Sequence, residues 1–271
     1  MTRRRFYAPP EAFSPDGRSV QLSDEETRHL RNVLRLKAGD EIFVFDGAGK
    51  EFQGRVQAVA RDSTEASVIK QVDPAQPESS LDLILAIALL KGEKFDLVIQ
   101  KATELGVTRI IPVITARADV RIKSDADAER KITRCERIAL EATKQCGRAR
   151  LMKIEKPVRF SGLVRGGETD SSAGGDDASE DACAPVKNSD VRIMFAERQG
   201  ASLAEALGDG HNRPQNVTAL IGPEGGWADD EIDQASIAGW KIVTLGGRTL
   251  RAETAAIVAA TLIQHRFGDL T

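Results

Sequence analysis

The sequence predicts an α/β protein in which a large parallel-sheet domain follows a smaller β-rich domain. From Leu81 onward, apolar runs typical of buried strands alternate with helical stretches, and this alternation is typical of βαβ units joined into a largely parallel sheet. Residues 1–72 instead hold short strand-like segments and one helix. Residues 73–80, which include Pro74 and Pro77, are expected to be a linker. We therefore predict one domain over 1–72 and another over 81–271.

The predicted helix of the first domain opens with a capping box, in which Ser23 is the N-cap and Glu26 follows three residues later. The helix has two faces, an apolar one with Leu30, Val33 and Leu34 and a basic one with Arg28, Arg31 and Arg35. The strands of this domain are predicted over 41–45, 51–59 and 65–72.

The second domain is predicted to contain five strands and five helices. The strands span 81–90, 109–115, 191–195, 217–221 and 241–245. The helices span 93–105, 125–146, 203–207, 229–238 and 252–267.

Composition excludes several classes of protein. The 271 residues are 41% apolar and 29% charged, as in ordinary globular proteins. The longest uncharged apolar run, 83–90, is far shorter than the roughly 20 residues that a membrane-spanning helix needs. The N-terminus leads into Pro9 and Pro10 rather than an apolar stretch, so no signal peptide is expected. Three cysteines without CxxC spacing and three scattered histidines predict no disulfide framework and no metal site, as expected in the cytoplasm.

The net charge of −3 conceals an uneven distribution. Residues 168–181 hold six acidic side chains and no basic one, and such a composition cannot bury enough apolar surface to stay ordered. We therefore predict a flexible acidic loop within 165–190. Basic side chains concentrate instead in two runs: one is N-terminal, with Arg3, Arg4 and Arg5 and the basic residues of the first helix, and the other spans 121–156. A charge run is often only a solvated face, but two basic runs in an acidic chain favour a polyanionic partner.

Two glycine-containing loops follow consecutive predicted strands, at 221–227 and 245–254. Because ligands of open α/β sheets bind at the carboxyl ends of strands, these loops predict a shared site. Neither loop matches GxGxxG or GxxxxGK[ST], the motifs that cradle phosphates. Acidic residues 229–231 would also repel a phosphate from the next helix. A cofactor without phosphate groups is therefore favoured.

These motifs resemble the RsmE family, SPOUT-class methyltransferases that act on a uridine N3 of small-subunit ribosomal RNA. The resemblance covers nearly the whole chain and departs from the family pattern at Cys146, at Thr249 and in the acidic loop. It is carried by Gly222-Pro223-Glu224-Gly225-Gly226 and by Leu245-Gly246, Arg248, Leu250-Arg251 and Glu253-Thr254-Ala255, with upstream matches at His29, Val33-Leu34-Arg35, Lys91, Lys94, Gln100-Lys101, 104–107, Glu136-Arg137, Glu141-Ala142, Gln145 and Arg148.

The resemblance implies a fold, a cofactor and partners. It implies a PUA-like RNA-binding β-barrel over 1–72, a SPOUT domain with a trefoil knot over 81–271, and a homodimer. The implied substrates are S-adenosyl-L-methionine and 16S rRNA, the latter within an assembled or late-assembly 30S subunit. The implied cofactor site comprises Leu220, Ile221, Gly222, Pro223, Glu224, Gly225, Leu245, Gly246, Thr249, Leu250, Arg251 and Thr254. Together with the basic runs, it suggests RNA contacts at Arg3, Arg4, Arg5, Arg28, Arg31, Arg35, Lys91, Lys94, Lys101 and Arg148.

Methylation of uracil N3 requires loss of a proton and stabilisation of charge on the neighbouring carbonyl oxygens. Arg251 is the first candidate for the electrostatic role, and Glu253 or Glu224 is the candidate proton acceptor. Structural interpretations stand beside these: Glu253 would stabilise a helix start, and Arg251 would brace the loops by pairing with Glu224 or Glu253. Trp227 is expected in the core rather than stacked on a base.

Two rival functions remain open at this point. One is an RNA-binding or ribosome-assembly factor that keeps the fold without catalysis. The other is a SPOUT methyltransferase that acts on another rRNA or tRNA position. An enzyme that uses a nucleotide would need a phosphate-binding motif, and none is found in the sequence.

Overall fold

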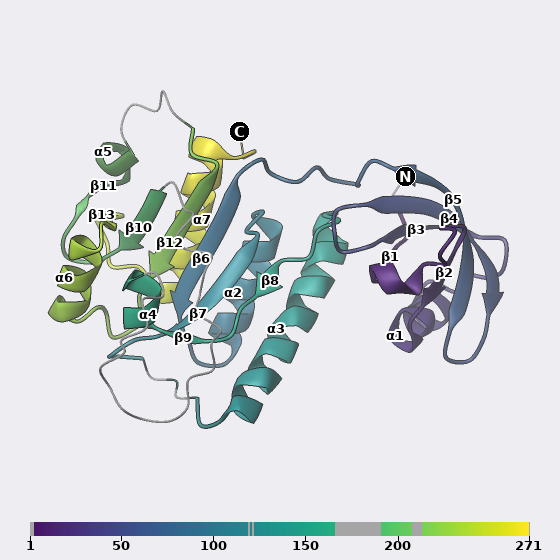
Figure 1. The fold of residues 1–271 in the computed structure, drawn as a ribbon, viewed down its shortest axis with the longest axis horizontal. Coiled ribbons are helices and arrows are strands. Elements are labelled where there is room, and N and C mark those ends of the chain that lie inside the picture. The colour runs from purple at the N-terminus through teal and green to yellow at the C-terminus, as the bar shows by residue number, and fades with distance from the viewer. Residues whose placement is uncertain (1–2, 119, 121, 166–190, 208–212, 271) are drawn as a thin grey trace. The chain divides into compact units, whose positions relative to one another are not determined.

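The computed structural model describes residues 3–118, 120, 122–165, 191–207 and 213–270 (Figure 1). The predicted acidic loop lies, from residue 166 onward, outside the described residues. Contacts divide the chain into two compact units. Unit 1 contains Met1–Glu78 and Leu140–Leu151, and unit 2 contains Ser79–Ala139 and Met152–Thr271. Residues 140–151, which sequence analysis places in the second domain, thus group with the N-terminal residues.

Unit 1 is built on a five-stranded sheet with the order β1-β3-β4-β5-β2. Strands β3, β4, β5 and β2 are antiparallel, whereas β1 lies parallel to β3. Phe6, Leu22, Leu30 and Ile42 are buried in its core. The three predicted strands are confirmed, and the two short ones were missed. The strands span Arg5–Tyr7 (β1), Ser19–Leu22 (β2), Glu41–Phe45 (β3), Glu51–Val59 (β4) and Thr64–Val72 (β5).

The predicted helix of unit 1 changes its winding halfway. An α-helix, α1, spans Asp24–Arg28 and is capped by the Ser23 hydroxyl, which accepts from the Glu26 amide. It continues as a π-helix over His29–Val33. Because a π-turn holds more residues than an α-turn, the apolar positions no longer share one face. Leu30 is buried but Val33 is 65% exposed, so the prediction of one apolar face was wrong.

Unit 2 contains an eight-stranded parallel sheet with the order β11-β13-β10-β12-β6-β7-β8, and β9 also pairs with β7. The five predicted strands are confirmed, and three two-residue strands were missed. The bounds are Asp82–Ala88 (β6), Arg109–Ile114 (β7), Lys153–Ile154 (β8), Val158–Arg159 (β9), Val191–Phe195 (β10), Ala201–Ser202 (β11), Asn216–Ile221 (β12) and Lys241–Thr244 (β13).

Helices cover both faces of this sheet, as Figure 1 shows. Alternate residues of β6 enter two separate cores: Leu83 and Leu85 pack with α2 and α7, whereas Ile84 and Ala86 pack with residues of α4 and α6. This is the layered arrangement that buries both faces of a parallel sheet. The helices span Glu93–Glu104 (α2), Asp125–Cys146 (α3), Phe160–Arg165 (α4), Leu203–Leu207 (α5), Asp229–Ile237 (α6) and Ala252–Phe267 (α7).

The path between β13 and α7 brings the two glycine loops together. Strand β13 pairs with β10, on the far side from β12. Helix α7, which follows it, packs instead against β12, β6 and α2. Segment 245–251 therefore crosses the carboxyl ends of β10 and β12. The trefoil knot stays a prediction that the family resemblance alone carries.

No helix in the described part of the chain is both long enough and apolar enough to span a membrane.

Candidate active site

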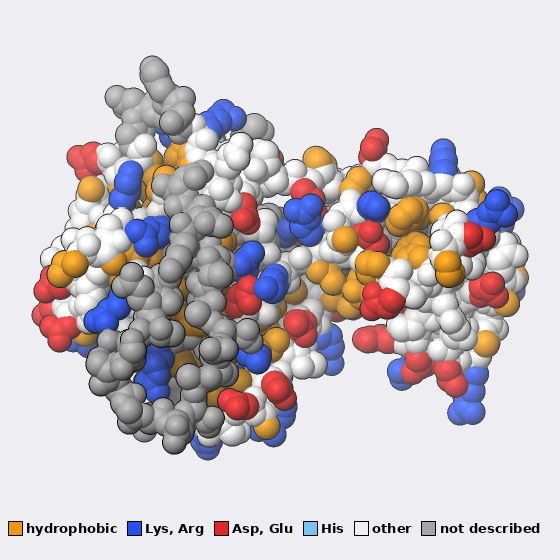
Figure 2. All heavy atoms as spheres, viewed as in Figure 1, with side chains coloured by type: hydrophobic (Ala, Val, Ile, Leu, Met, Phe, Trp, Pro, Cys, Tyr) orange, Lys and Arg blue, Asp and Glu red, His pale blue; other side chains and the backbone are white. Residues whose placement is uncertain are grey.

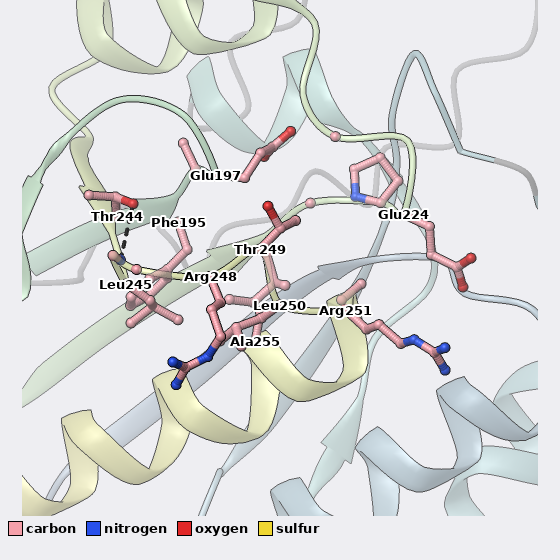
Figure 3. A pocket seen from close by; sticks show the side chains of 18 of the residues that line it. Phe195, Glu197, Glu224, Thr244, Leu245, Arg248, Thr249, Leu250, Arg251 and Ala255 are labelled. Atoms are coloured by element: carbon pink, nitrogen blue, oxygen red, sulfur yellow. Dashed lines mark hydrogen bonds between the residues drawn. The ribbon is translucent and has the colours of Figure 1, made fainter.

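A pocket of about 580 Å³ lies at the carboxyl ends of three adjacent strands, β13, β10 and β12 (Figure 3). The segments that follow these strands form most of its wall, and the start of α2 contributes one side chain. The lining residues are Lys94, Phe195, Ala196, Glu197, Ile221, Gly222, Pro223, Glu224, Gly226, Thr244, Leu245, Gly246, Gly247, Arg248, Thr249, Leu250, Arg251, Ala252 and Ala255. This is the edge at which open α/β sheets bind ligands.

Both predicted glycine loops line the pocket. Of the residues proposed for the cofactor or for catalysis, nine are in the wall: Ile221, Gly222, Pro223, Glu224, Leu245, Gly246, Thr249, Leu250 and Arg251. Four are not: Leu220, Gly225, Glu253 and Thr254. Leu220 is fully buried in β12, where it packs in a core cluster. Glu253 is buried in the first turn of α7, and its Oε2 has no hydrogen-bond partner among the described residues.

The first loop is packed tightly beneath the pocket. The Trp227 indole N–H donates to the Phe195 carbonyl at 2.8 Å, and the ring packs against Phe160. Trp227 is thus a core residue, as expected. A Cβ at Gly222 would lie 2.8 Å from the Trp227 ring, so only glycine fits there. The loop backbone at Gly222, which directly follows β12, therefore packs closely against the Trp227 ring.

The second loop leaves its backbone open. Gly246 and Gly247 have φ angles of 67° and 70°, which L-residues rarely adopt. An added Cβ at either position would meet nothing within 4 Å. The loop therefore presents bare backbone to the pocket, which suits a ligand recognised by peptide groups.

Charged side chains surround this backbone from several directions. Lys94 at the start of α2 pairs with Glu224, the two being 2.6 Å apart. Arg251 is exposed and forms no ion pair with Glu224 or Glu253 among the described residues, so it does not brace the loops. Figure 3 shows the Arg248 and Arg251 side chains diverging from each other, so that their guanidinium groups lie well apart.

Sequence analysis missed the segment after β10, namely Phe195, Ala196 and Glu197. The strand itself was predicted, but only the sheet order places β10 between β12 and β13. A signal was present in the sequence, because the acidic residue Glu197 comes two residues after the end of a predicted strand. Without the strand order, nothing connected Glu197 to the two glycine loops.

Two of the arginines proposed as RNA contacts are structural in unit 1, which corrects that proposal. The Arg5 guanidinium lies 4.7 Å from the Phe45 ring and donates to Glu51 and to carbonyls near the end of α3. Arg148 is 4% exposed and pairs with Glu78 at 2.9 Å. Arg3 also pairs with Glu51, at 3.1 Å. A buried guanidinium group needs acceptors to compensate its charge. The carboxylates that pair with Arg5 and Arg148 are distant in the sequence, so the residues next to each arginine do not reveal its structural role.

The other proposed RNA contacts keep exposed or half-buried side chains. Arg28 pairs with Asp24, and Lys101 pairs with Glu104, whereas Arg31 donates to the Arg61 carbonyl. Arg4, Arg35 and Lys91 are exposed. The face in Figure 2 shows basic side chains interspersed with acidic ones rather than one continuous basic patch. His29 makes an edge contact with the Phe6 ring.

No group of three or more His, Cys, Asp or Glu residues in the described ranges could hold a metal ion.

Comparisons with known proteins agree with this geometry. Residues 77–264 match the family described as an RNA methyltransferase domain, and residues 22–69 match the RNA methyltransferase PUA domain. The chain is 33% identical to Ribosomal RNA small subunit methyltransferase E of Synechocystis, over 97% of this chain and 77% of that protein. It is also 33% identical to the protein of that name in Mesomycoplasma hyopneumoniae, over 89% of this chain and 91% of that protein.

A solved structure shows the same fold over the whole chain. Ribosomal RNA small subunit methyltransferase E from Neisseria gonorrhoeae, crystallised bound to S-adenosyl methionine, superposes with a TM-score of 0.80 at 30% identity. The match covers 100% of each chain.

Proposed function

The chain belongs to the ribosomal RNA small subunit methyltransferase E family and is a methyltransferase; from this premise we propose that it transfers a methyl group from S-adenosyl-L-methionine to N3 of one uridine in 16S rRNA. The observation that carries the proposal is the pocket in which both glycine loops meet at the ends of β10, β12 and β13. We place this cytoplasmic reaction in ribosome biogenesis, on an assembled or late-assembly 30S subunit.

The pocket fits S-adenosyl-L-methionine. Its volume of about 580 Å³ lies in the usual range of small-molecule sites. Open backbone at Gly246 and Gly247 suits recognition of an adenine by peptide groups. Helix α6 begins with Asp229, Asp230 and Glu231, which disfavours a phosphate-bearing ligand. Ile221, Gly222, Leu245, Gly246, Thr249 and Leu250 would hold the cofactor.

Bound S-adenosyl-L-methionine supplies the electrophilic methyl group, so the protein has to bind, orient and stabilise charge. N3 of uracil becomes nucleophilic when its proton leaves, and negative charge then spreads to the flanking carbonyl oxygens. Arg251 is exposed in the pocket wall, so its N–H groups are available to those oxygens.

We assign to Glu224 the role of accepting the N3 proton. This carboxylate lines the pocket, whereas Glu253 does not. The Lys94 ammonium holds one of its oxygens, Oε1, at 2.6 Å. The interaction orients the carboxylate and leaves its second oxygen for the substrate or a bridging water.

The RNA must reach this site with an unpaired uridine, because N3 lies on the Watson–Crick edge. Unit 1 contains the match to the PUA domain of RNA methyltransferases, and we assign RNA binding to the proposed domain 1–72. Arg4, Arg28, Arg31 and Arg35 are its proposed phosphate contacts. We further propose that the enzyme works as a homodimer.

The test uses purified protein, labelled S-adenosyl-L-methionine and 30S subunits from a strain that lacks the native methylation. Label recovered on uridine N3 after nuclease digestion would support the proposal. Label on a ribose hydroxyl or on a tRNA base would contradict the N3 assignment and favour another SPOUT specificity. Cofactor and RNA binding without any transfer would favour a non-catalytic assembly factor.

A further inference from the structure

Glu197 is a pocket carboxylate that has no counter-ion among the residues that the structure describes. It follows β10 and lines the cavity beside the two glycine loops. Among the described residues it forms no hydrogen bond or ion pair, whereas the other lining carboxylate, Glu224, is paired with Lys94. Figure 3 shows Glu197 on the opposite side of the 245–251 loop from the Arg248 guanidinium.

The Glu197 carboxylate fits against the first loop because residue 226 of that loop is a glycine. A Cβ built on Gly226 would overlap Glu197 Oε1, so the carboxylate occupies the space that a side chain would fill. Gly226 also has a φ of 69°, which favours glycine. The carboxylate therefore lies directly against the loop after β12.

We propose that Glu197 discriminates between the cationic methyl donor and its demethylated product. This inference rests on the proposed function. During transfer the bond from sulfur to the methyl carbon breaks, a bond from N3 to that carbon forms, and the N3 proton leaves to a base or to water. The sulfonium thereby becomes a neutral thioether. Glu197, which is the uncompensated carboxylate among the described lining residues, then no longer attracts the ligand through a full positive charge.

Coulomb's law supports this role without requiring direct contact. In a cavity of about 580 Å³, a lining carboxylate lies within about one Debye length, roughly 8 Å at physiological ionic strength, of most bound atoms. Arg248 and Arg251 also line the wall and repel a cation. Removing the Glu197 charge should thus weaken the binding of the donor about tenfold more than the binding of the product.

The test compares dissociation constants for S-adenosyl-L-methionine and S-adenosyl-L-homocysteine by calorimetry. We expect the ratio of the donor's constant to the product's to rise about tenfold in Glu197→Gln and to stay near wild type in Glu197→Asp. Asp233→Asn is the matched control, because Asp233 is exposed on α6 and outside the pocket wall; it should leave the ratio unchanged.

Equal losses of affinity for both ligands would overturn the proposal, because they would show that Glu197 binds the ribose or the ammonium group that both ligands contain. An unchanged ratio would overturn it as well. If Glu197→Gln fails to fold, Glu197→Ala, which also removes the charge, takes its place in the same comparison. Wild-type protein that binds neither ligand would overturn the proposed cofactor itself, which is a separable failure.

Discussion

The Lys94 ammonium donates to Glu224 Oε1 at 2.6 Å and joins the first turn of α2 to the loop after β12. Helix α2 follows β6, which is the neighbour of β12 in the sheet. The ion pair therefore connects two adjacent strand ends at the rim of the pocket. Both side chains are 38% exposed, so the pair orients Glu224 more than it stabilises the fold.

Glu224→Gln should reduce the rate of methyl transfer about 100-fold, because a neutral amide cannot accept the N3 proton. The free energy of unfolding should change by no more than about 1 kcal/mol, as is usual for an exposed pair. Lys94→Met is the matched variant, since it breaks the same pair and keeps the carboxylate. Single-turnover methylation distinguishes the roles: equal losses in both variants would show that Glu224 only braces the loop.

Arg251→Ala should lower the methylation rate about 100- to 1000-fold, since it removes the donors to the charged uracil oxygens. Affinity for S-adenosyl-L-methionine should change much less. Arg248→Ala removes an arginine of the same loop whose side chain diverges from that of Arg251 in Figure 3, and it should reduce the methylation rate less. A large loss of cofactor affinity in Arg251→Ala would contradict the electrostatic role.

Gly222→Ala should destabilise unit 2 by about 1–3 kcal/mol, because overpacking displaces a well-packed side chain. The new methyl group would lie 2.8 Å from the Trp227 ring, which is held by its hydrogen bond to Phe195. Urea unfolding measures the loss. Gly162→Ala is the control, since a Cβ there would meet nothing within 4 Å; an equal loss at both positions would refute the steric explanation.

Glu51→Ala should destabilise unit 1 by about 3–5 kcal/mol, the usual effect of removing one partner of a buried ion pair. The Glu51 side chain is 0% exposed and accepts from Arg3, from Arg5 and from the Ala75 amide. Asp16→Ala breaks an exposed pair with Arg18 and should cost little. Thermal unfolding of the two variants gives the comparison, and similar melting temperatures would contradict the buried role.

Cys135 should resist thiol reagents in the native protein at pH 8. Burial raises the pKa of the Cys135 thiol to about 11, so almost no thiolate forms at that pH. Because this pKa exceeds that of the unfolded chain, the contribution to stability should decline as pH rises from about 9 toward 11. A protein with Cys146 and Cys183 changed to serine isolates the thiol. Rapid labelling without denaturant would contradict the prediction.

Local patterns were sufficient for most elements, because their cause lies within a few residues. The N-cap at Ser23, the helix over Asp125–Cys146 and the alternation of strands and helices after Leu81 all appear as expected. The full capping box was wrong, because the Glu26 carboxylate pairs with Lys144 instead of the Ser23 amide. Strands of two or three residues, such as Arg5–Tyr7, were missed because so short a run carries no periodic signal. The π-helix over His29–Val33 was missed because the helical pattern of the sequence was interpreted with the period of an α-helix.

The sequence by itself determined the fold class, the two glycine loops and their resemblance to a methyltransferase family, since these depend on residue types at close spacing. Only the tertiary structure decided which strands are neighbours, and so brought Glu197 and Lys94 to the pocket and left Glu253 outside its wall. It also decided that Arg5 and Arg148 are buried partners of carboxylates rather than free cations. The reason is physical: burial and ion pairing arise between residues far apart in the chain, and the charge of a side chain does not reveal its neighbours.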